Sequence, residues 1–81
     1  MKSKSSEVFI GIDVCKERLD IANDSSSEVW SESNNDAGVC SLVEKLSSPK
    51  PSLVVMEATG GLETLLYSSL VTADIPAVVV N

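Results

Sequence analysis

Histidine is absent from this 81-residue sequence, and cysteine is scarce. Without histidine the chain contains no Ser–His–Asp or Cys–His nucleophile system and no histidine-ligated zinc. The two cysteines, Cys15 and Cys40, are far apart in the sequence and cannot complete a tetrahedral zinc site by themselves. We expect both to be free thiols in a reducing cytoplasm.

Basic residues and long apolar runs are also lacking. Six Lys and Arg against twelve Asp and Glu give a net charge of −6, which excludes histone-like or ribosomal proteins that bind nucleic acid through clustered basic side chains. No apolar run approaches the roughly 20 residues that span a bilayer, and the polar start of the chain does not resemble a signal peptide. We therefore expect a cytoplasmic protein with no membrane contact.

The length leaves room for one small domain. Hydrophobic residues make up 43% of the chain and charged residues 22%, a composition typical of a folded protein. Residues 1–6 are polar and are expected to form a disordered tail. We assign residues 7–81 to a single domain.

Apolar periodicity predicts seven secondary-structure elements. Residues 8–12 and 53–56 are almost continuously apolar, which indicates central strands buried on both faces. Residues 19–23 and 28–32 alternate between apolar and polar side chains and follow short links, which favours antiparallel hairpins. Apolar residues at helical spacing predict helices over 39–46 and 62–70, and residues 77–80 read as a fifth strand.

The resulting order is β-β-β-α-β-α-β. Right-handed crossovers place the strand at 53–56 beside the strand at 8–12, and the strand at 77–80 beyond it. The sequence therefore predicts an α/β fold with a mixed sheet in the order 3-2-1-4-5. This is the arrangement of a ribonuclease-H-like (RuvC-like) sheet, incomplete at the C-terminus.

Asp13 and Glu57 each stand at the carboxyl end of a predicted central strand. If those strands are parallel neighbours, their ends lie side by side, about 5 Å apart. Two carboxylates there would repel each other unless a cation lies between them, and oxygen ligands without nitrogen or sulfur suit Mg²⁺ or Mn²⁺. Asp13 and Glu57 are thus the predicted metal-binding and catalytic residues of a phosphodiester-cleaving site; the alternative is that both are solvated residues where a strand meets a turn.

Weaker signals surround this pair. Thr59, Gly60 and Gly61 precede the second predicted helix, where free backbone N–H groups favour an anion, although a tight turn alone explains the glycines equally well. Lys16, in the loop after Asp13, is a candidate phosphate contact or simply a solvated side chain. Trp30 fits a cover for the core or a partner contact better than a base-stacking platform.

Three segments together resemble the start of a DEDD transposase of the insertion-sequence-110 class, a family related to the pilin-gene invertases. They are residues 11–20 (GIDVCKERLD), residues 55–63 (VMEATGGLE) and residues 75–81 (IPAVVVN). The resemblance covers nearly the whole chain from about Phe9. Cys15 stands where the family usually has serine, and Leu62 where an aromatic residue is common.

The resemblance implies that residues 7–81 are the N-terminal portion of a RuvC-like nuclease domain in a larger transposase. Asp13 and Glu57 match the first two of the four acidic residues that bind divalent metal for DNA cleavage and exchange. The resemblance also implies DNA and an element-encoded guide RNA as partners, a homo-oligomeric full-length protein and a place at the bacterial nucleoid. With two of four ligands, the chain alone is expected to be inactive.

Two other functions are compatible with the same pattern. An actin-like or sugar-kinase phosphotransferase shares the element order, but it would want Gly and Ser or Thr directly after Asp13 to hold ATP phosphates. A non-catalytic oligomerisation module is the alternative from a different class, because an incomplete sheet leaves strand edges and faces bare.

Overall fold

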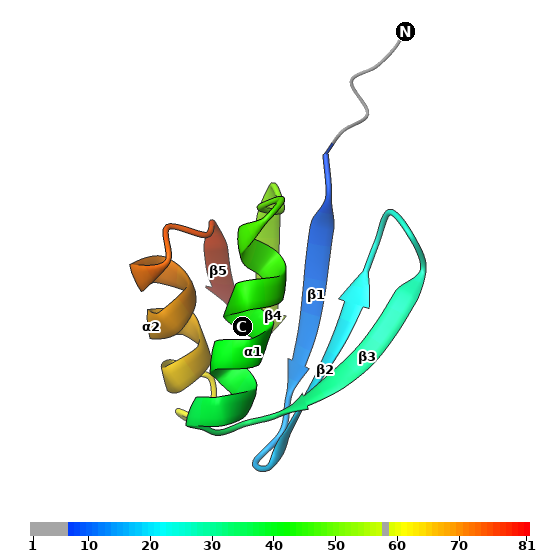
Figure 1. Cartoon of the computed structure of the whole chain (residues 1–81). Coiled ribbons are helices and arrows are strands. Elements are labelled where there is room, and N and C mark those ends of the chain that lie inside the picture. The colour runs from blue at the N-terminus through cyan, green and yellow to red at the C-terminus, as the bar shows by residue number, and fades with distance from the viewer. Residues whose placement is uncertain (1–6, 58) are drawn as a thin grey trace, which may run out of the picture.

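The computed structural model describes residues 7–57 and 59–81, so the predicted tail at residues 1–6 lies outside the described residues. Seven elements follow one another in the predicted order (Figure 1). They are β1 (Phe9–Val14), β2 (Arg18–Asn23), β3 (Glu28–Ser33), α1 (Asp36–Ser47), β4 (Leu53–Glu57), α2 (Thr64–Thr72) and β5 (Ala77–Val80). The strands form one sheet in the order β3-β2-β1-β4-β5, which confirms the prediction.

The sheet is mixed, as its connections require. β1 pairs with β2, and β2 with β3, in antiparallel register. β4 pairs with β1 on one side and with β5 on the other, both times in parallel register. The parallel pairs are joined through α1 and α2, because a parallel neighbour needs a long crossover connection. This arrangement is consistent with a ribonuclease-H-like fold.

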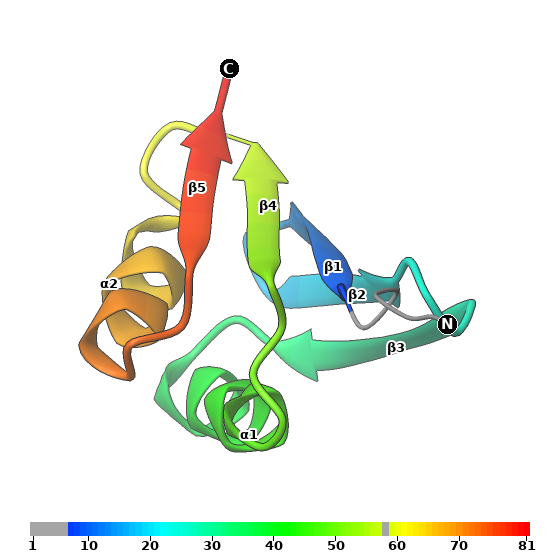
Figure 2. The same ribbon diagram turned by 90° about the horizontal axis from the view of Figure 1, so that it is seen from above.

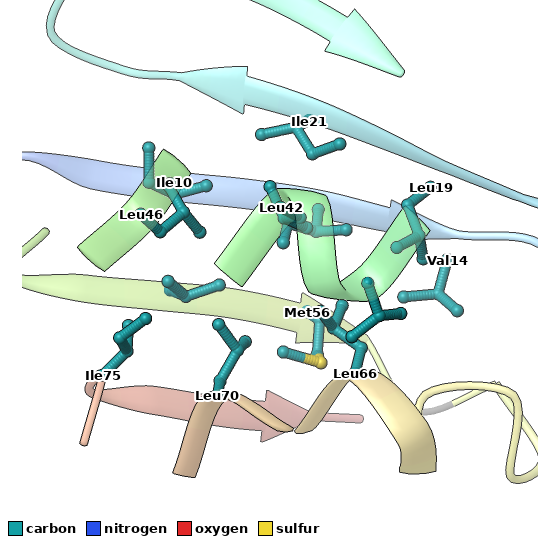
Figure 3. Close-up of a cluster of buried hydrophobic side chains, with 13 residues drawn as sticks. Ile10, Val14, Leu19, Ile21, Leu42, Leu46, Met56, Leu66, Leu70 and Ile75 are labelled. Carbon is teal, nitrogen blue, oxygen red and sulfur yellow. The ribbon is translucent and has the colours of Figure 1, made fainter. Parts of the chain in front are cut away.

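Both helices pack against the same face of the sheet (Figure 2). A single cluster of buried apolar side chains joins them to the inward-facing residues of the strands (Figure 3). Leu42 of α1 and Leu66 and Leu70 of α2 are completely buried in it. Burial of side chains this size contributes about 1.5–3 kcal/mol each to folding, so this cluster is the main source of stability.

The opposite face of the sheet is open, and the prediction that residues 8–12 and 53–56 are buried on both faces is wrong. Burial alternates along β1, where Ile10 and Ile12 are buried while Phe9 is 39% exposed. In β4, Val54 is buried and Val55 is half-buried. The physical reason is that, within the part of the chain that the structure describes, both helices cover one face only.

The start of α1 is fixed by a cap and a close contact. The side chain of Asn35 accepts a hydrogen bond from the backbone N–H of Gly38 at 2.9 Å, which satisfies one of the free donors of the first turn. Gly38 lies so close to Ser33, the last residue of β3, that a Cβ atom there would overlap the Ser33 carbonyl oxygen. Val39, Leu42 and Leu46 then turn toward the sheet.

The second helix begins two residues later than the sequence predicts. Gly60 and Gly61 adopt positive φ angles of 70° and 101°, so the turn after β4 continues to residue 63 and α2 starts at Thr64. Leu62 consequently lies in the turn and is 39% exposed, not part of the core as its spacing suggested. No helix within residues 7–57 and 59–81 combines the length and the apolar character needed to cross a membrane.

Candidate metal centre

The two predicted carboxylates lie on the open face of the sheet, on neighbouring strands. The parallel register pairs Gly11 with Val55 and Ile12 with Met56. One step further along, Asp13 comes opposite Glu57, the last residue of β4. Both side chains are exposed, and both line one shallow depression together with Gly11, Val55 and Val80. The fold thus brings together the two residues that the sequence singled out.

A third carboxylate, which sequence reasoning missed, lies on the other side of Asp13. The antiparallel register of β1 and β2 pairs Asp13 with Asp20. Ligand atoms of Asp13, Cys15 and Asp20 all lie within 4.8 Å of one another. The predicted strands at 8–12 and 19–23 did not fix this pairing, because it depends on a turn centred between Lys16 and Glu17, which places residue 20 opposite residue 13.

The Asp20 carboxylate is already engaged by protein groups. Arg18 Nε donates to both of its oxygens at 3.0 and 3.2 Å, and the Ser31 hydroxyl donates to Oδ1 at 2.6 Å. The Ser31 hydroxyl, together with the Arg18 guanidinium, holds the pKa of Asp20 below its ordinary value. Asp20 is therefore a fixed, ionised neighbour of Asp13.

These residues form one cross-strand row. Ser31, Asp20 and Asp13 follow one another through the pairings of β3, β2 and β1, and Glu57 and Val80 continue the row on β4 and β5. Among residues 7–57 and 59–81, no hydrogen bond or ion pair engages the carboxylates of Asp13 and Glu57. Their oxygens are free for a cation of the hard, oxygen-binding kind, and the donor set fits Mg²⁺ or Mn²⁺.

The turn after β4 contains its own anion. Oε1 of Glu63 accepts hydrogen bonds from the Thr59 backbone N–H at 3.0 Å, from the Thr59 hydroxyl at 3.1 Å and from the Gly61 N–H at 3.2 Å. The Thr59 N–H is the main reason why the pKa of Glu63 lies below its ordinary value. The donors of Thr59 and Gly61, two of the three residues that the sequence offered to a phosphate, thus already donate to a carboxylate of the chain itself.

Asn34 connects the segments that follow the two carboxylates. Its side-chain Nδ2 donates to the carbonyl oxygen of Cys15 at 2.9 Å and to that of Leu62 at 3.2 Å. Cys15 closes the β1–β2 turn through its N–H, which donates to Arg18 O at 2.8 Å. One amide group therefore ties the end of β1 to the turn after β4, at the same end of the sheet as Asp13 and Glu57.

Lys16, Trp30 and the two cysteines complete the set of residues that the sequence singled out. Lys16 is exposed in the β1–β2 turn, at the end of the sheet that carries the carboxylates. Cys15 and Cys40 are free thiols. Trp30, on the edge strand β3, is half-buried against the core, with Lys45 Nζ 5.5 Å from its ring centroid. Trp30 therefore covers part of the core.

The fold and the site define an acidic α/β domain with a row of carboxylates across the open face of a mixed, ribonuclease-H-like sheet. A family model described as "Transposase", that of the insertion-sequence-110 class of DEDD transposases, matches residues 10–81. The chain belongs to this family of transposases. None of the curated proteins matches it.

Proposed function

We propose that this chain contributes Asp13 and Glu57 to a divalent-metal site that cleaves and exchanges DNA strands in a transposase. The observation that carries the proposal is their shared depression on the open face of the sheet. Two adjacent carboxylates with no partner among the described residues are arranged to hold Mg²⁺ or Mn²⁺, and such an ion, when bound, activates a nucleophile and stabilises the leaving oxygen. The residues themselves hold and orient the ion.

Asp13 has carboxylate neighbours on both sides, and the contacts favour Glu57 as its co-ligand. Both oxygens of Asp20 already accept hydrogen bonds from Arg18 or Ser31, so binding a metal directly would cost Asp20 these partners. The Glu57 side chain has no such partner among the described residues. We infer that Asp20 acts on the ion from a distance, through its charge.

The backbone donors after β4 are less suited to phosphate than Lys16. Thr59 and Gly61 donate to Glu63, and a phosphate would first have to displace that carboxylate. Lys16 is exposed at the same end of the sheet, and within residues 7–57 and 59–81 no carboxylate forms an ion pair with it. We propose Lys16 as the phosphate contact, with Thr59, Gly60 and Gly61 contributing only if Glu63 moves away.

The family match favours a transposase over the phosphotransferase alternative. The wider assignments belong to the same proposal: residues 7–81 as the N-terminal portion of a RuvC-like domain, DNA as substrate at the bacterial nucleoid, an element-encoded guide RNA and a homo-oligomer. The chain alone holds two of the four acidic ligands that the family uses. We expect it to bind metal weakly and not to cut DNA.

Titration with Mn²⁺ tests the metal site, because this paramagnetic ion broadens the NMR signals of nearby nuclei. Amide signals of Asp13 and Glu57 should broaden first in the wild type. Glu57→Gln should weaken Mn²⁺ binding more than Asp20→Asn, and Asp24→Asn, which removes the same charge beyond the far end of β2, should leave it unchanged. Equal losses for all three variants, or broadening away from Asp13, would contradict the proposal.

A further inference from the structure

Three of the four glycines are required by the fold. Gly60 and Gly61 have positive φ angles that side chains disfavour. Gly38 has no room for a Cβ atom against the Ser33 carbonyl. The backbone conformation or the packing of the chain therefore requires glycine at each of these three positions.

At Gly11, the fourth glycine, neither the backbone conformation nor the packing requires glycine. A Cβ atom there would meet nothing within 4 Å, and its φ lies outside the positive range that favours glycine. It lies in the middle of β1, a central strand, where glycine is less stable than alanine and where β-branched residues are preferred. Folding alone would favour a side chain at this position.

The bare position lies beside the two carboxylates. Gly11 precedes Asp13 by two residues, about 7 Å along the same face of the strand, and it lines the same depression as Asp13, Glu57 and Val55. Its cross-strand neighbours are Ala22 on β2 and Val55 on β4. The surface of the depression beside Asp13 and Glu57 is therefore formed by small or apolar residues and is open.

We propose that Gly11 is a contact position for the DNA strand: its missing side chain lets the nucleotide next to the cleaved phosphate lie directly against β1. This inference rests on the proposed function. A phosphate held at Asp13 and Glu57 brings the adjoining deoxyribose over the depression, and the carbon-bound hydrogens of the sugar match an apolar floor. Because Gly11 is paired with strands on both sides, its backbone offers van der Waals contact there and not additional hydrogen bonds.

A side chain at position 11 would partly fill the depression and push the DNA strand away from β1. Inserting a methyl group into a close contact costs about 1–3 kcal/mol, which corresponds to about thirtyfold weaker DNA binding at the middle of that range. Gly11→Ala should therefore weaken binding about thirtyfold, and Gly11→Val should weaken it further. Neither substitution touches a carboxylate, so Mn²⁺ binding should be retained.

The test measures four properties of the 81-residue chain: its thermal unfolding, its Mn²⁺ affinity, its binding of a fluorescent single-stranded DNA oligonucleotide in saturating Mn²⁺, and its self-association in sedimentation. The matched control is Ala22→Val, which adds bulk to the neighbouring position on the same face, outside the depression. The expected result is an unfolding temperature equal to or above the wild type for Gly11→Ala, unchanged Mn²⁺ affinity, and loss of DNA affinity in the Gly11 variants only.

Each other result overturns the inference in a recognisable way. Wild-type DNA affinity in both Gly11 variants would show that nothing lies against β1. A wild type that binds Mn²⁺ but no DNA would remove the inference and leave the proposed metal site standing. A wild type that binds no Mn²⁺ would remove both. Unchanged DNA binding combined with reduced self-association in sedimentation would assign the open face to a second copy of the chain.

Discussion

Replacing Asp13 by asparagine is expected to change the stability of the chain in opposite directions with and without metal. In the absence of metal, Asp13 and Glu57 are like charges on adjacent strands about 5 Å apart. At that distance two exposed charges repel by about 0.8 kcal/mol in water, and physiological salt reduces this to about 0.4 kcal/mol. Asp13→Asn should therefore raise the unfolding temperature by about 2–3 °C in a chelating buffer.

With metal bound, the wild type should be more stable than Asp13→Asn. An ion that binds only the folded chain stabilises it by about 2.7 kcal/mol when its concentration is one hundred times Kd. For a domain of this size, that shifts the unfolding temperature of the wild type upward by about 10–20 °C. The asparagine variant lacks half of the carboxylate pair and should gain far less, so the two stability curves cross as Mn²⁺ is added.

Thermal unfolding followed by circular dichroism, in EDTA and across a Mn²⁺ series, measures the stability of each variant without and with metal. Asp24→Asn is the matched control, since it removes one negative charge at an exposed position beyond β2. It should respond to Mn²⁺ like the wild type. Parallel curves for the wild type and Asp13→Asn would refute the reasoning, because they would mean that stabilisation by the ion does not pass through Asp13.

Three further predictions concern the surroundings of the site. Gly38→Ala should destabilise the chain by about 2 kcal/mol in urea unfolding, because the clash with Ser33 outweighs the gain of about 1 kcal/mol in helix propensity; a net gain would contradict the contact. Glu63→Gln should lower the unfolding temperature at neutral pH, and the deficit should shrink as the pH falls. The pKa of Glu63 is depressed in the folded chain, so its contribution is complete above its ordinary value of 4.5 and is lost below it; a deficit independent of pH would count against this. Asn34→Ala removes two hydrogen bonds and should cost about 1–2 kcal/mol in the same urea assay. It should also weaken Mn²⁺ binding, whereas full Mn²⁺ affinity would show that the tie does not position the carboxylates.

Most of the fold followed from local patterns. The short links around residues 15–17 and 24–27 dictate hairpins, and the handedness of crossovers then fixes the strand order 3-2-1-4-5. What the pattern could not supply is which face the helices choose. Val55 and Phe9 look like core residues in sequence, but both helices pack on the other face, so an apolar run alone does not reveal an open side.

The candidate site, like the fold, could be predicted from the sequence only in part. Asp13 and Glu57 were accessible to prediction because each directly follows an apolar run, and strand ends in a parallel pair meet at one edge. Asp20 required the exact hairpin register, a one-residue property that composition does not carry. The occupation of Thr59 and Gly61 by Glu63 depends on how the turn closes in three dimensions, and no spacing rule predicts that closure.

The packing of the core also determines where the carboxylates point. Ile12 and Val14 are buried beneath the helices, so the residue between them must face the open side, because successive side chains of a strand alternate. Met56 directs Glu57 to that side in the same manner. Shifting either strand by one residue would bury a carboxylate and expose core side chains, at a cost far above the repulsion between Asp13 and Glu57. Hydrophobic packing therefore holds two mutually repelling charges side by side, and this is the condition under which a cation binds between them.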